Sequence, residues 1–575
     1  MDAKQKKILT GVASLIILAW LISPLLFSSR EPALPLSREP PAFDAYQAFQ
    51  ATEKFVTQNP RRLLGSLESR QSTGFLHDCL QELGYQVDYS HFDARIGRRK
   101  EAGRNILAYR QGMHPEILAL AAHFDTARTT VQGAMKNGAA VGVLLEMARV
   151  LAAKPTRRSL LLILSDGGEW GMAGAQDIAV NYPQRDRIAA VLSLDYVAAG
   201  DLAAFSLEES GQLKGYSPPW LRTLARHAAQ SQGLPVLEPS GFREHFERAL
   251  LISKADQGPF LRAGIPAINL GSRSTDPARE RALYHTGQDT IENLKSGSIQ
   301  KYGEVAETIM KSMDESPSIP RESMESLRLW DSLFLAPRAI GALHWLSFLP
   351  LPLVFFFLWI NHLKRLSLIL IARELLAALG TAVPFLIVYF SIGLFRAARR
   401  LPLYNLYPAT ARDPVLENPS WGILGGILGT ALFVAVLCYV VAKLSFRNLP
   451  KPDFHVSKLA LMGLLIFTAA LALAHNAYWA FSFLVLPAWI WALVGWSGQI
   501  KGRVVNWILI LAAGIPCYAV LSALASGLFL KWNFVWYHVL ALHTGLFTPA
   551  GYFLAAAATA IGLRFMAIQN HGAGT

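Results

Sequence analysis

Imidazole and carboxylate side chains recur in the first half of the chain, most of them where an apolar run ends. Each run is long enough for one buried strand, and the residues that follow it are polar. Imidazole nitrogen and carboxylate oxygen are ligands that suit Zn²⁺, which binds four of them tetrahedrally when separate loops bring them together. The pattern therefore offers a candidate zinc site. Its residues are two histidines, one glutamate and one aspartate: His123, Glu169, Asp195 and His285.

The apolar runs before these residues predict strands of one sheet. Residues 116–122, 159–165 and 189–194 are short and apolar, and the segment 139–152 between two of them has helical periodicity. Strands that alternate with helices form a mostly parallel α/β sheet, flanked by helices. Polar residues that follow parallel strands then lie along the carboxyl edge of the sheet.

Six motifs in register resemble a known enzyme family. The succession HFDT, GAMKNGAAVGVLLEMAR, DGGEWGMAGA, SLDYV, KADQGPFLRAGIPAINLG and YHTGQDTIENL is similar to the co-catalytic di-zinc aminopeptidase family, metallopeptidase family twenty-eight, which also contains glutaminyl cyclases. The resemblance spans residues 45–315 and implies a peptidase-like α/β fold. It also implies that His123 and Asp195 bind one zinc, and that Glu169 and His285 bind the other.

The same resemblance assigns two further acids to the pocket. Asp125 matches the acid that orients the first histidine, a role that metal sites generally require. Asp256, in KADQGPF, matches a family acid near the pocket.

Two departures from the family pattern affect the chemistry. The family aspartate that bridges both metals aligns with Lys136, and the family general base aligns with Gly168, directly before Glu169. Hydrolysis at such a site needs a metal-bound water and a carboxylate that accepts its proton, and glycine provides no carboxylate. An ammonium at Lys136 repels dications and neutralises Glu169 and Asp195. We therefore expect a degenerate site in which Lys136 takes the place of the metal.

Three alternatives remain open for the pocket, so the expected cofactor is one zinc or none. The pocket is a salt-bridged and hydrogen-bonded cluster without metal, a site for a single zinc, or a working hydrolase site whose base comes from elsewhere. A serine nucleophile is not indicated, because the sequence has no G-x-S-x-G motif.

The rest of the chain predicts a multi-span membrane protein. Only 17% of the 575 residues are charged and the mean hydropathy is +0.29, which excludes an ordinary soluble protein. We interpret residues 1–30 as a signal-anchor transmembrane helix, residues 31–335 as an extracytoplasmic zinc-aminopeptidase-like domain, and residues 336–575 as a membrane domain of about seven helices. The expected spans are 8–28, 339–360, 373–395, 421–443, 457–475, 477–497, 504–529 and 536–563.

Charge distribution predicts the orientation of the chain in the membrane. The net charge of +13 comes largely from basic residues that flank the spans, so we expect membrane lipids, and no nucleic acid, as partners. A cytoplasmic N-terminus places most basic loops inside, although the arginine-rich loop 396–412 then lies outside. The domain 31–335 has no N-x-S/T sequon. We expect a bacterial inner-membrane protein with a periplasmic domain, with the endoplasmic reticulum as the alternative.

The domain order suggests two functions. One amino-terminal span, an outside peptidase-like domain and several further spans resemble the attachment subunit of the glycosylphosphatidylinositol transamidase. This resemblance implies a non-catalytic subunit for substrate binding or assembly, which acts with a catalytic partner on peptide or lipid-linked substrates outside the cytoplasm. The alternative is a membrane-tethered zinc metallopeptidase, an aminopeptidase-like hydrolase.

Overall fold

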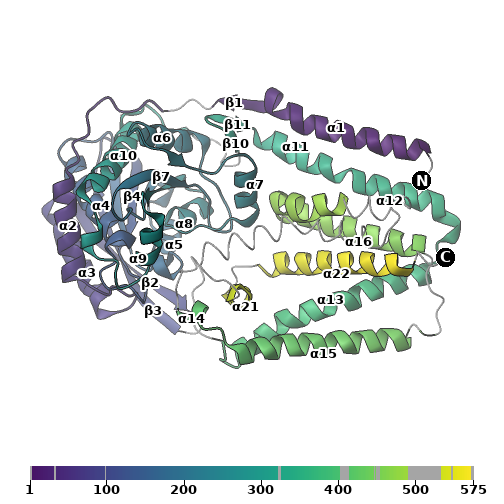
Figure 1. The fold of residues 1–575 in the computed structure, drawn as a ribbon. Coiled ribbons are helices and arrows are strands. Elements are labelled where there is room, and N and C mark those ends of the chain that lie inside the picture. The colour runs from purple at the N-terminus through teal and green to yellow at the C-terminus, as the bar shows by residue number, and fades with distance from the viewer. Residues whose placement is uncertain are drawn as a thin grey trace. The chain divides into compact units, whose positions relative to one another are not determined.

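The chain divides into two compact units (Figure 1). The computed structural model describes residues 3–30, 34–96, 99–320, 326–401, 414–445, 447, 454–489, 533–544 and 548–571. The main part of one unit is Ser29–Ala336, and the other unit contains Met1–Ser28 and Pro337–Pro402.

An eight-stranded mixed sheet forms the centre of the first unit. Its strand order is β2-β3-β5-β4-β6-β9-β7-β8. The neighbouring strands β5, β4, β6 and β9 are parallel, whereas β2, β3 and β7 make antiparallel pairs toward the two edges. The predicted α/β fold and its three strands are confirmed, and the parallel part of the sheet is its centre. The strands are β2 Gln86–Ile96, β3 Arg99–Arg110, β4 His114–His123, β5 Arg158–Ser165, β6 Ile188–Leu194, β7 Leu202–Glu208, β8 Val236–Leu237 and β9 Ala267–Ser274.

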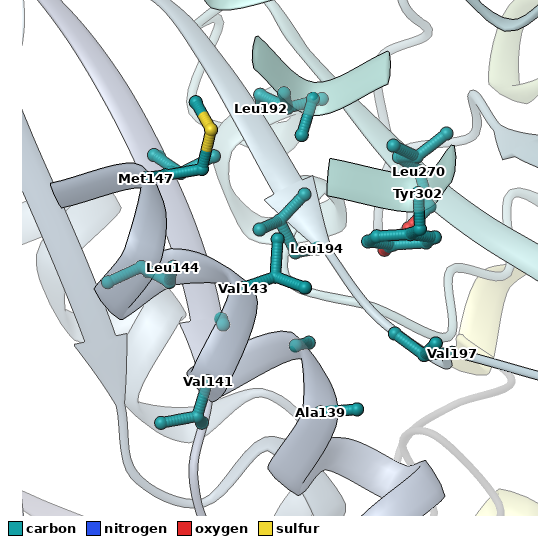
Figure 2. Packing of buried hydrophobic residues seen from close by; sticks show 14 of the residues in the cluster. Ala139, Val141, Val143, Leu144, Met147, Leu192, Leu194, Val197, Leu270 and Tyr302 are labelled. Atoms are coloured by element: carbon teal, nitrogen blue, oxygen red, sulfur yellow. The ribbon is translucent and has the colours of Figure 1, made fainter. Parts of the chain in front are cut away.

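Helices pack against this sheet through a continuous apolar core. Alternate residues of β4, Leu118, Leu120 and Ala122, belong to one buried cluster, as expected when successive side chains point to opposite faces. Figure 2 shows residues of α4 packed in this cluster with residues of β6. The core therefore fixes where the strand ends lie. The helices of this unit are α2 Ala45–Gln58, α3 Leu67–Glu82, α4 Ala139–Ala152, α5 Ala173–Asn181, α6 Pro219–Gln230, α7 Gly241–Leu250, α8 Gln257–Arg262, α9 Pro277–Leu283 and α10 Ser296–Glu315.

A smaller sheet contains strands close in sequence to the boundaries of the two units, Ser28/Ser29 and Ala336/Pro337. It contains β1 (Ser28–Arg30), β11 (Leu333–Leu335) and β10 (Leu327–Trp330), in that order. β10 and β11 form an antiparallel hairpin.

The second unit consists of apolar helices. Five described helical segments are long and apolar enough to cross a membrane: Lys4–Phe27, Pro337–His362, Leu368–Ala397, Trp421–Ser445 and His455–His475. They coincide with the first five expected spans. They correspond to α1 Ala3–Phe27, α11 Pro337–Phe348 with α12 Pro350–His362, α13 Leu368–Ala397, α15 Trp421–Ser445 and α16 Phe454–His475.

The remaining expected spans differ from the structure or lie outside its described part. Within 477–497 the described part is the apolar helical segment Ala477–Trp489, and residues 490–497 lie outside the described residues. The expected span 536–563 consists of two helices, α21 (Phe534–Thr544) and α22 (Pro549–His571). A new helix begins at Pro549 because the Thr548 hydroxyl accepts a hydrogen bond from the Gly551 amide. The span 504–529 and most of the loop 396–412 lie outside the described residues.

Candidate functional site

The carboxyl ends of three parallel strands deliver three of the predicted site residues. His123 is the last residue of β4, and Asp195 directly follows β6. Glu169 lies in the 3-10 turn that follows β5. Gly167 enters this turn with φ +73°, a left-handed conformation that glycine adopts without steric strain.

Asp125 connects two of these strand ends. Its carboxylate lies 3.1 Å from His123 Nδ1 and accepts hydrogen bonds from the amides of Gly168 (2.7 Å) and Glu169 (3.1 Å). Asp125 is fully buried. It therefore fixes the imidazole and the glycine-rich turn at once, and the contact with Nδ1 turns His123 Nε2 toward Asp195 at 3.5 Å.

Lys136 places its ammonium inside the predicted metal cluster. Lys136 Nζ donates to Asp195 Oδ1 at 2.6 Å, contacts Asp195 Oδ2 as well, and lies 3.9 Å from Glu169 Oε1. Asp289 fixes the backbone of the segment that carries Lys136, because its carboxylate accepts hydrogen bonds from the amides of Met135 (2.7 Å) and Lys136 (3.2 Å). The side chain is buried. A cation supplied by the chain therefore neutralises the acids of the pocket.

Glu169 and His285 form the second half of the site. His285 Nε2 lies 3.1 Å from Glu169 Oε1, and both side chains are buried. The ring of Tyr284 stacks on the His285 imidazole with centroids 3.8 Å apart. The structure thus brings together His123, Glu169, Asp195 and His285, the four residues that the sequence predicted as zinc ligands.

Charge within the pocket shifts the ionisation of its members. Burial raises the pKa of Glu169, yet His285 and the ammonium of Lys136 hold it below its ordinary value. Burial likewise opposes ionisation of Asp195, and Lys136 and His123 lower its pKa. For His123, burial and Lys136 disfavour protonation, but Asp125 and Asp195 raise its pKa to about 10. The pocket is therefore a set of mutually stabilised ions.

Gly168 has no room for a side chain. A Cβ at this position would lie 2.3 Å from Cγ of His123, which is far inside van der Waals contact. The imidazole thus fills the space next to the Gly168 backbone. A carboxylate at position 168, where the family places its base, requires His123 to move.

Three buried acids surround the site. Asp256 is held by the hydroxyl of Ser165, and burial raises the pKa of Asp256 to about 6. Asp166 does not join the cluster but accepts hydrogen bonds from the hydroxyl of Ser69 (3.1 Å) and the amide of Arg104 (3.3 Å). Asp289 was missed by the sequence interpretation, although it stands in the same motif as His285.

The donor set does not fit a metal ion in this arrangement. One observation favours a ligand: within the described part of the chain, His123 Nε2 is buried without a hydrogen-bond partner. Against it, both oxygens of Asp195 contact the Lys136 ammonium, which therefore occupies the position that a metal chelated by this carboxylate would take. Among the described residues, no group of three or more His, Cys, Asp or Glu side chains is arranged to hold a metal ion.

Comparison with known proteins agrees with the fold. Residues 105–310 match the family model Peptidase family M28. The chain is 25% identical over 239 residues to the alkaline phosphatase isozyme conversion protein of Escherichia coli (strain K12), which covers 37% of this chain and 67% of that protein. It is 27% identical over 194 residues to aminopeptidase YwaD of Bacillus subtilis (strain 168), covering 33% of this chain and 40% of the relative.

A third relative, whose name describes a membrane protease, aligns with the chain over more residues than the first two. The chain is 23% identical over 306 residues to the vacuolar membrane protease of Candida albicans (strain WO-1), which covers 50% of this chain and 33% of the protease. The chain thus spans less than half the length of two of these three relatives. Among solved structures, Porphyromonas gingivalis glutaminyl cyclase matches with a TM-score of 0.41 and 21% identity over 47% of this chain and 99% of that chain. The zinc aminopeptidase BSAP from Bacillus subtilis matches with a TM-score of 0.40 and 17% identity over 49% of this chain and 100% of that chain.

Proposed function

We propose that this chain is a membrane-anchored, peptidase-fold subunit that binds a peptide or lipid-linked substrate outside the cytoplasm without hydrolysing it. A separate catalytic subunit acts on the bound substrate. The observation that carries the proposal is the contact of the Lys136 ammonium with both oxygens of Asp195. This contact replaces a bridging carboxylate and dications with a single cation that belongs to the chain.

The chemistry of the pocket supports this proposal. An ammonium donates hydrogen bonds, but it cannot bind a water molecule as a Lewis acid and lower its pKa. Gly168 offers no proton acceptor, and a base there would displace His123. The side chains that remain are suited to hold charge and hydrogen-bonding groups in fixed positions.

A second candidate function is a membrane-tethered zinc metallopeptidase. It is favoured by the unpartnered His123 Nε2 noted above and by relatives whose names are aminopeptidase and vacuolar membrane protease. For this function the Lys136 side chain would have to leave the cluster. The resemblance to the transamidase attachment subunit remains a prediction.

Metal content and peptide hydrolysis of the purified full-length chain separate the two functions. Under the first proposal, metal analysis finds no bound zinc, a peptide library releases no amino acids, and zinc does not raise the melting temperature. In Lys136→Asp we expect the opposite response, because the substitution recreates a carboxylate at the bridging position and gathers like charges that a cation must neutralise. Two zinc ions per wild-type chain, or hydrolysis that chelators abolish, would overturn the first proposal.

The proposal also includes a topology in which both termini are cytoplasmic and residues 31–335 are outside. Labelling of intact cells with a membrane-impermeant thiol reagent tests it. A cysteine introduced at the exposed Met113 should react, whereas a cysteine added at the extreme C-terminus should not. Labelling of the C-terminal cysteine from outside contradicts this topology.

A further inference from the structure

The small sheet is joined by the chain to two candidate spans. α1 ends at Phe27 and β1 begins at Ser28, while β11 ends at Leu335 and α11 begins at Pro337. β1 and β11 are neighbours in the sheet, and β10 pairs with β11. The small sheet is therefore joined to α1 without a linker and to α11 through the single residue Ala336.

Exposed apolar side chains gather at β10. Trp330, the last residue of β10, is 59% exposed, and Phe242, near the start of α7, is 80% exposed. The two elements meet there, since a Cβ at Gly241 would lie 3.7 Å from the carbonyl oxygen of Leu329. Leu237 of β8 is 44% exposed. We call Leu237, Phe242 and Trp330 the aromatic edge.

Ion pairs hold the aromatic edge together. Arg226 bridges Glu238 (3.2 Å) and Asp331 (2.7 Å), which are the chain neighbours of Leu237 and Trp330. A buried network joins α6, α7 and β10 beneath it, through the ion pairs Arg222–Glu209, Arg222–Glu244, Arg248–Glu244 and Arg328–Glu209. Ion pairs thus hold together the elements that carry the exposed side chains.

We infer that the aromatic edge lies in the head-group layer of the membrane that α1 and α11 cross. Trp330 pairs with Leu333, and Leu333 is four residues from Pro337, which is about 13 Å of extended chain. This reach is an upper limit, so the chain allows Trp330 to lie within the interfacial region, which extends about 5–7 Å beyond the hydrocarbon core on each side. Trp is enriched at that interface because its ring is apolar and its N–H is polar. A lipid surface therefore explains why apolar side chains are exposed here.

Lipid quenching in the full-length chain tests this inference. In a background in which Cys79, Cys438 and Cys517 are replaced by Ala, Phe242→Cys and Trp330→Cys are labelled separately with an environment-sensitive fluorophore, and the protein is placed in nanodiscs. Phospholipids that carry a nitroxide quencher near the head group should lower the emission of both labels at least twofold. The matched control is Met113→Cys, whose native side chain is also apolar and 72% exposed, and which should not be quenched.

Two outcomes would overturn the inference. Quenching at Phe242→Cys and Trp330→Cys no stronger than at Met113→Cys would show that lipid does not cover the edge. Stronger quenching by nitroxides at the bilayer centre would place these residues in the hydrocarbon core. Phe242 and Trp330 are largely exposed, so their replacement leaves the fold intact. The test measures lipid contact alone and is independent of whether the pocket hydrolyses or binds a substrate.

Discussion

Replacement of Lys136 by Met should strongly destabilise the unit that contains Ser29–Ala336. Methionine keeps the length of the side chain but removes the ammonium, which leaves Asp195 buried without its partner. Removal of one member of a buried ion pair is destabilising by about 3–5 kcal/mol. For a large domain this corresponds to a fall in melting temperature of roughly 6–20 °C.

The matched control is the same substitution at an exposed lysine. Lys295 Nζ lies 2.7 Å from Asp201 Oδ2, a distance close to that of the Lys136–Asp195 pair, but the two side chains are 57% and 64% exposed. Exposed pairs contribute less than about 1 kcal/mol, so Lys295→Met should change the melting temperature little. The measurement is thermal unfolding of the purified full-length chain in metal-free buffer.

A double variant identifies the cause of the effect. Lys136→Met with Asp195→Asn removes both charges, so it should be more stable than Lys136→Met alone, and the difference reports the coupling between the two sites. If Lys136→Met melts within about 2 °C of Lys295→Met, the ammonium does not neutralise the pocket, and the reasoning about Lys136 is refuted.

Three further predictions concern buried groups around the site. Burial, and secondly the charge of Asp125, raises the pKa of Asp166 to about 7. The stability that Asp166 contributes is therefore complete below pH 3.8 and is lost as the pH rises through about 7. Asp166→Asn should remove this decline, which is measured as melting temperature against pH. Gly168→Ala should be destabilising by about 1–3 kcal/mol, because the new Cβ would overlap the His123 ring. The control Gly74→Ala on α3, where a Cβ meets no atom within 4 Å, should not have this effect. Denaturant unfolding of the two variants measures the difference. Asp289→Asn keeps only one acceptor oxygen for two amides, and it should lower stability by about 1–3 kcal/mol and speed hydrogen exchange of those amides; unchanged exchange would contradict this role.

The sequence predicted the parts of the site that depend on strand ends. His123 ends one buried apolar run and Asp195 follows another, and such runs are typical of parallel strands that are covered on both faces. The carboxyl ends of parallel strands lie at the same edge of the sheet, so the position of both residues at that edge follows from the pattern. Glu169 and Lys136 were placed by motif alignment. The structure places the Lys136 ammonium against Asp195 and 3.9 Å from Glu169 Oε1.

Other features depend on three-dimensional packing that no local pattern encodes. The sequence interpretation treated Gly168 as the loss of a base, whereas the structure shows that the His123 ring excludes any side chain there. Asp289 acts on backbone amides more than 150 positions away, and its own motif contains no sign of that contact. Residues 536–563 were interpreted as one span because apolar residues lie on both sides of Pro549, whereas the described part contains two helices, α21 and α22.

The predicted zinc ligands can be explained as parts of a closed set of charges. Lys136 binds Asp195, His285 contacts Glu169, and Asp125 fixes both His123 and the turn that carries Glu169. Because a buried charge is tolerated only when it is paired, these contacts alone are sufficient reason for the four donors to lie together. Their convergence is therefore no argument for hydrolysis. The side chain that distinguishes the two functions is Lys136, because its ammonium contacts both oxygens of Asp195 and so occupies the position that a chelated metal would take.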